Sequence, residues 1–160
     1  MTTFEKILTI AFFCISISMT SVNAAENTII KNMNDLKNWV KENDVAFSFD
    51  AITPEKQKAV LTQLKKNKSY KYEDKDEASF LITIHEEGQP IRGYYFSKPA
   101  ADAYPGILEF IVVKTPSGEL LSNTRGWSGD NDAAFRVWFT AFQRRLEKTF
   151  PGTKPAQPPQ

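Results

Sequence analysis

Five large apolar side chains recur at helical spacing near the end of the chain, and this stripe constrains the fold more than any other feature. Steps of three and four residues separate its members, which are Phe135, Trp138, Phe139, Phe142 and Leu146. Charged side chains such as Arg144 fall on other faces, as in a helix with one buried side. We therefore predict a helix from Asp132 to Thr149 that covers a sheet, with the ring of Trp138 in the middle of the core near Phe110.

The residues around this helix fix its ends. Asp130, Asn131 and Asp132 can cap its first turn, whereas Pro151 and Gly152 stop it. The two aspartates could instead join a cation site. The twelve-residue calcium-loop pattern is missing, so capping is the preferred interpretation.

Alternating apolar and polar residues predict five strands before that helix. They occupy residues 45–50, 80–86, 91–96, 107–113 and 120–125, with helices over residues 28–43 and from Thr53 onward. The lysine-rich and then acidic stretch between residues 56 and 77 is interpreted as a solvated helix followed by an acidic turn, in preference to an anion-binding patch. A right-handed crossover would make the first two strands parallel. We expect an α+β fold in which a mixed, mostly antiparallel sheet of about five strands is covered by helices as a two-layer sandwich.

The first 24 residues have the features of a secretory signal peptide. Lys6 precedes an apolar run from Ile7 to Ile17 that is too short to span a bilayer comfortably. Cleavage is expected after Ala24, and cleavage after Ala25 or a retained anchor are the alternatives. Residues 25–150 would then form a single globular domain, followed by a disordered, proline-rich tail at 151–160. The protein is expected in the periplasm or outside the cell, with no stable membrane anchor.

Composition removes several classes of function. Cys14 is the only cysteine and lies inside the predicted signal, so the mature chain would have no thiol for catalysis, disulfides or metal binding. The formal net charge is +1, which gives no case for a nucleic-acid partner. No sequence motif indicates a cofactor or a metal site, and the oligomeric state is left open.

His85 is the only histidine and the natural candidate for a catalytic base. It has no second histidine for a metal site, and no nucleophile motif accompanies it. The preferred interpretation is a residue at a strand end. The alternative is a small hydrolase that uses His85 with nearby carboxylates such as Glu86 and Glu87.

Four aromatic residues form a candidate partner surface, because the core pattern does not obviously claim them. They are Tyr94, Tyr95, Tyr104 and Trp127. Such side chains favour interfaces because a large apolar body carries a polar group. Burial in the core is the competing interpretation.

Several short motifs from Ala78 to Pro151 resemble a domain-of-unknown-function family of small bacterial envelope lipoproteins. They are the Ala-Ser-Phe-Leu-Ile-Thr-Ile strand from Ala78, the Lys-Thr-Pro-Ser-Gly-Glu-Leu turn from Lys114, the Gly126-Trp127 step and the Phe150-Pro151 helix end. The lipid-accepting cysteine of such lipoproteins is missing after the signal. The resemblance implies an envelope location and no known activity. We expect an exported, non-catalytic binding or envelope accessory protein, with an envelope protein as its candidate partner. The alternatives are the hydrolase, or an immunity or inhibitor protein against an envelope-acting toxin or enzyme.

Overall fold

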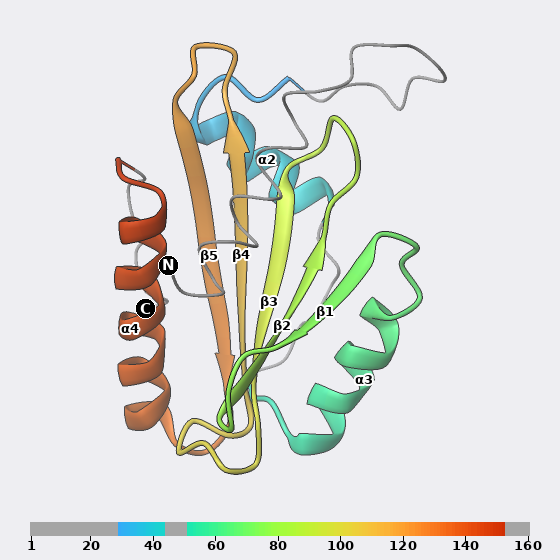
Figure 1. Ribbon diagram of the computed structural model, residues 1–160, viewed down its shortest axis with the longest axis vertical. Coiled ribbons are helices and arrows are strands. Elements are labelled where there is room, and N and C mark those ends of the chain that lie inside the picture. The colour runs from blue at the N-terminus through green and yellow to red at the C-terminus, as the bar shows by residue number, and fades with distance from the viewer. Residues whose placement is uncertain (1–28, 44–50, 153–160) are drawn as a thin grey trace.

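The computed structural model describes residues 29–43 and 51–152 and contains one sheet with three helices (Figure 1). The elements are, in order, α2 (Met33–Glu42), α3 (Pro54–Leu64), β1 (Tyr70–Asp74), β2 (Ser79–Ile84), β3 (Ile91–Ser97), β4 (Gly106–Lys114), β5 (Leu120–Ser128) and α4 (Asp132–Thr149). Each strand pairs antiparallel with the next, so the sheet order is β1-β2-β3-β4-β5. The α+β class and the helix-covered sheet are confirmed.

The sheet differs from the prediction in its first strand. β1 follows α3 and pairs with β2 from Tyr70↔Ile84 to Asp74↔Phe80, where an acidic turn was expected. Alternating charges on an edge strand are compatible with a sheet because that edge faces water. The predicted strand at 45–50 lies outside the described residues, as do the signal and residues 153–160 of the tail. Within the described chain every strand pair is antiparallel rather than mixed.

Helix α4 has the predicted bounds and covers one face of the sheet. Asn131 caps it by accepting a hydrogen bond from the backbone N–H of Ala134. Its buried side packs on the sheet through Phe135, Phe139, Phe142 and Leu146. The prediction that Trp138 lies mid-core is wrong, because Trp138 is only partly buried at the margin and meets the Phe135 ring edge-on.

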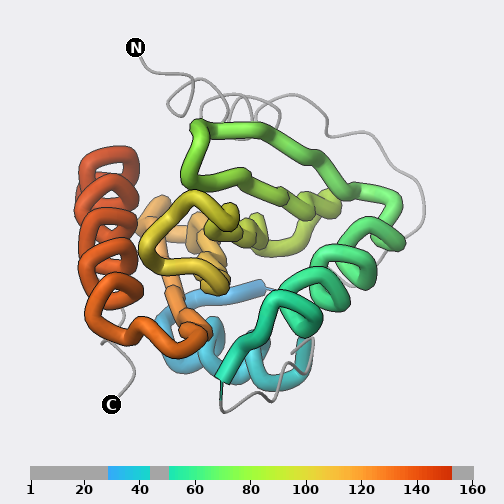
Figure 2. Tube along the Cα trace, turned by 90° about the horizontal axis from the view of Figure 1, so that it is seen from below, coloured from blue at the N-terminus to red at the C-terminus, as the bar shows by residue number. Residues whose placement is uncertain are grey.

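Helices α2 and α3 pack on the opposite face, so the sheet is the middle of three layers rather than half of a two-layer sandwich (Figure 2). Val60 and Leu64 of α3 cover Ile82, Tyr94 and Phe96. Leu36, Trp39 and Val40 of α2 cover Ile111 and Leu121 farther along the same face. Thr53 caps α3 by accepting a hydrogen bond from the backbone N–H of Lys56. None of the helices in the described residues is long and apolar enough to cross a membrane.

Candidate functional site

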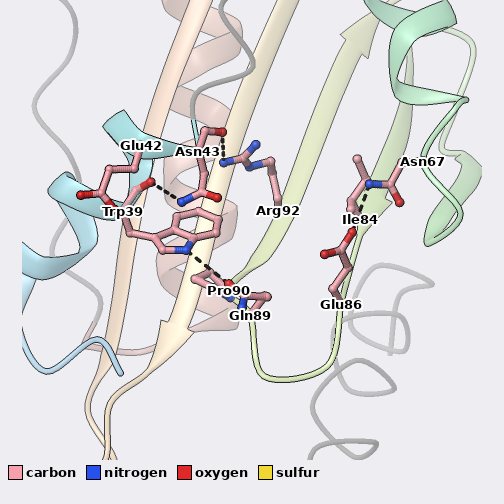
Figure 3. Close-up of a pocket in the computed structure, with 9 residues that line it drawn as sticks. All are labelled: Trp39, Glu42, Asn43, Asn67, Ile84, Glu86, Gln89, Pro90 and Arg92. Carbon is pink, nitrogen blue, oxygen red and sulfur yellow. Dashed lines mark hydrogen bonds between the residues drawn. The ribbon is translucent and has the colours of Figure 1, made fainter. Parts of the chain in front are cut away.

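A polar pocket opens on the α2 side of the sheet, between the end of α2 and the turn that joins β2 to β3 (Figure 3). Its volume is about 420 Å³, within the range of small-molecule sites. The residues that line it are Trp39, Glu42, Asn43, Asn67, Ile84, Glu86, Gln89, Pro90 and Arg92. We call it the Trp39 pocket. Most of its lining side chains are polar or charged.

Hydrogen bonds fix the α2 wall of the Trp39 pocket. The indole Nε1 of Trp39 donates to Gln89 Oε1 over 3.3 Å. Asn43, the C-cap of α2, donates from Nδ2 to the Trp39 carbonyl at 2.9 Å. Arg92 Nη2 in turn donates to the Asn43 carbonyl at 3.0 Å. The end of α2 is therefore tied to β3 through side chains that line the pocket.

The opposite wall comes from the residues after α3 and the β2–β3 turn. Asn67 accepts from the Ser69 N–H at 2.7 Å and donates to Glu86 Oε1 at 3.3 Å. The turn itself closes through a bond from Gln89 N–H to the Glu86 carbonyl, with Gly88 at a φ of 75° that favours glycine. In Figure 3 the Glu86 carboxylate lies on the Asn67 side of the pocket, whereas the Glu42 carboxylate points away on the other side.

Arg92 forms the floor of the pocket and belongs to a buried charge cluster. Its guanidinium lies 5.0 Å from the centre of the Trp39 ring, and its Nε lies 3.7 Å from Glu109 Oε1 on the neighbouring strand. The other carboxylate oxygen of Glu109 accepts from Arg125 Nε on β5. Glu109 is only 1% exposed. We call Arg92, Glu109 and Arg125 the buried charge cluster, because three neighbouring strands contribute its charges on the α2 side of the sheet.

The sequence analysis missed Glu109, although the sequence contains a signal for it. Glu109 is the one charged residue inside the otherwise apolar run from Ile107 to Val113. A carboxylate inside a strand that is buried on both faces needs a cationic partner. The partners Arg92 and Arg125 could not be named from sequence because they come from two other strands.

Two of the four predicted surface aromatics are core residues. Tyr94 is 0% exposed beneath α3, and Tyr95 is 4% exposed beneath α4 on the other face of the sheet. Burial raises the pKa of both hydroxyls above its ordinary value, and the Glu109 carboxylate adds to the rise in the pKa of Tyr94. The prediction that Tyr94 and Tyr95 form a partner surface is wrong, because both side chains are buried in the core.

Tyr104 and Trp127 keep partly exposed positions. Tyr104 lines a second pocket of about 380 Å³ beside α3, whose floor includes the stacked rings of Phe80 and Phe96. Trp127 packs partly against the core beneath α3, with the Arg125 guanidinium 5.2 Å from its ring centre. Their role as a partner surface stays a prediction.

His85 lines neither of these two pockets. Burial and the nearby charge of Lys71 lower its pKa below the ordinary value, and Glu87 opposes them. Its neighbour Glu86 faces the Trp39 pocket, so the predicted pairing of His85 with nearby carboxylates in one cleft does not occur there. In residues 29–43 and 51–152, no group of three or more histidine, aspartate or glutamate side chains is placed to hold a metal ion.

Comparison of the chain with protein-family models, with curated proteins and with solved structures finds no match. The resemblance to envelope lipoproteins therefore stays a prediction from sequence. The site has to be interpreted from its own geometry.

Proposed function

We propose that the protein is an exported, non-catalytic binding protein that holds a small polar ligand in the Trp39 pocket. One observation carries this proposal. Glu86 and Arg92 line the same pocket with opposite charges, yet within the described chain they form no ion pair with each other. Groups of opposite charge held apart by hydrogen bonds to other residues leave room for a ligand between them.

Binding is preferred to catalysis because of where the reactive groups lie. A general base must come within hydrogen-bond reach of the proton that it takes. His85 is outside the pocket, and the two carboxylates that line it, Glu42 and Glu86, have no histidine, lysine or hydroxyl side chain beside them among the described lining residues. These residues orient a ligand by charge and hydrogen bonds.

The signal-peptide features of residues 1–24 support export, and export can be tested separately from binding. The mature protein should begin at Ala25 and carry no lipid. Mass spectrometry of the intact protein purified from its native host measures both. A species that retains Met1, or one with acyl chains at Cys14, would contradict the exported and unanchored state.

A thermal-shift screen tests the binding. Amino acids, neutral sugars, polyamines and inorganic phosphate are added one at a time to the mature protein, and at least one should raise its Tm by several degrees. Glu86→Gln should change that rise, because it removes a charge from the pocket wall. The rise should be smaller for a ligand that donates hydrogen bonds to Glu86 and larger for inorganic phosphate, which Glu86 repels. Glu87→Gln is the matched control, since Glu87 is an exposed neighbour that does not line the pocket. Equal shifts in both variants, or no shift with any compound, would overturn the proposal.

A further inference from the structure

The floor of the Trp39 pocket has donor capacity that the protein does not use. Arg92 is 8% exposed, and Nη2 is the nitrogen that donates to the Asn43 carbonyl. Its Nε is buried beside Glu109 Oε1 at 3.7 Å, so the two Nη nitrogens are the ones that can face a ligand in the pocket. An arginine carries several N–H donors, and burying them without acceptors is unfavourable. A ligand that presents a carboxylate to this guanidinium would supply an acceptor that the protein lacks.

The wall of the pocket that contains Asn67 carries the Glu86 carboxylate, which favours a cationic group on the ligand. Glu86 is exposed to the pocket, and the Asn67 amide on its Oε1 leaves acceptor capacity on the carboxylate. An ammonium group on the ligand would pair with Glu86 through a charge-assisted hydrogen bond. A plain anion would be repelled by Glu86, and a plain cation by Arg92. A ligand that carries both charges satisfies both walls.

The remaining lining has room for an organic side chain. Ile84, Pro90 and the indole of Trp39 supply apolar surface between the charged groups. The volume of about 420 Å³ equals that of about fourteen liquid waters, since each occupies about 30 Å³. A molecule of amino-acid size fits this space.

From this arrangement we infer that the ligand of the Trp39 pocket is a small zwitterion of the α-amino acid class. Its carboxylate lies against Arg92 and the Gln89 amide, and its ammonium lies against Glu86. The inference rests on the proposed function and specifies the chemistry of the same site. Glu109 acts as a positioning residue, because it holds Arg92 in the floor without lining the pocket.

Isothermal titration with matched derivatives tests the ligand class. The twenty common L-amino acids are titrated first, and the tightest is then compared with its amide and its N-acetyl form. Each derivative removes one charge and should bind about tenfold more weakly or worse. Glu86→Gln should weaken the binding of the free amino acid similarly but strengthen the binding of its N-acetyl form, because that form is an anion that Glu86 repels. Glu87→Gln should change neither affinity.

The other outcomes separate this inference from the proposed function. Two results would overturn the zwitterion and leave the binding site standing, each in place of amino-acid binding. One is binding of a neutral sugar or a polyamine that Glu86→Gln weakens, and the other is binding of inorganic phosphate that Glu86→Gln strengthens. Amino-acid binding that Glu86→Gln does not weaken would overturn the assignment of the ammonium to Glu86. Absence of binding by every probe would overturn both.

Discussion

Glu109 stabilises the sheet from inside, because its buried carboxylate lies between the guanidinium groups of Arg92 and Arg125. Glu109→Ala would leave Arg92 buried without its counter-charge. Removing one partner from a buried ion pair typically costs about 3 to 5 kcal/mol of unfolding free energy. Urea denaturation measures this loss. Glu119→Ala, at an exposed turn, is the control and should stay within about 0.5 kcal/mol of the wild type. Similar losses in the two variants would show that the charge cluster does not stabilise the fold.

The lowered pKa of His85 predicts how the unfolding free energy of the protein depends on pH. Burial, aided by Lys71, holds its folded pKa below the ordinary value of about 6.5. The folded state therefore favours the neutral ring, and the stability that His85 contributes is present above about pH 6.5 and is lost as the pH falls through the folded pKa. Between about pH 7 and 5, the wild type should lose more stability than His85→Gln. Denaturation at several pH values measures the difference, and parallel pH profiles would contradict it.

At the scale of elements, α4 separates buried from marginal aromatics. Phe142 is buried against the rings of Tyr95 and Phe110, whereas Trp138 lies at the edge of the same cluster. Phe142→Ala should cost about 3 to 5 kcal/mol of unfolding free energy. Trp138→Ala should cost less, and Arg144→Ala should stay within about half a kcal/mol. Chemical denaturation of the three variants ranks them, and a larger loss for Trp138 than for Phe142 would contradict the packing.

The periodic elements were predictable from sequence for a physical reason. The apolar stripe of α4 and the alternating or apolar runs of β2 to β5 each bury one or both faces, and burial imposes a period on the sequence. β1 was missed because its edge position lets charged residues such as Lys71 and Glu73 occupy a strand. Tyr94 and Tyr95 were assigned to a surface because their polar hydroxyls do not indicate burial in a sequence pattern.

The candidate site could not have been predicted in the same way. Trp39, Asn67 and Arg92 come from α2, the connection between α3 and β1, and β3, and only the packing of these segments brings them together. The sequence does contain Glu109 as an isolated charge in an apolar strand. That signal predicts a buried ion pair, but it does not predict the pocket beside it.

In the whole molecule, the sheet separates the aromatic cluster beneath α4 from the proposed binding site. Helix α4 covers one face of the sheet and α2 covers the other (Figures 1 and 2). The Trp39 pocket is lined by residues at the end of α2, on the face away from the aromatic cluster of α4. Substitutions on the exposed side of α4 should therefore leave ligand affinity unchanged. This arrangement also provides an internal control, because the three tryptophans of the chain lie in three different surroundings.

The indole N–H signals of these tryptophans test directly whether the Trp39 pocket binds an amino acid. In a ¹H–¹⁵N NMR spectrum of the mature protein, titration with each L-amino acid should shift the signal of Trp39, whose Nε1 bonds to Gln89 in the pocket wall. The signals of Trp127 and Trp138 should stay in place, and Trp39→Phe assigns the moving signal. At the same ligand concentration, the shift should be smaller in Glu86→Gln and unchanged in Glu87→Gln. A Trp39 signal that stays fixed with amino acids, sugars, polyamines and phosphate alike would contradict a ligand site in this pocket.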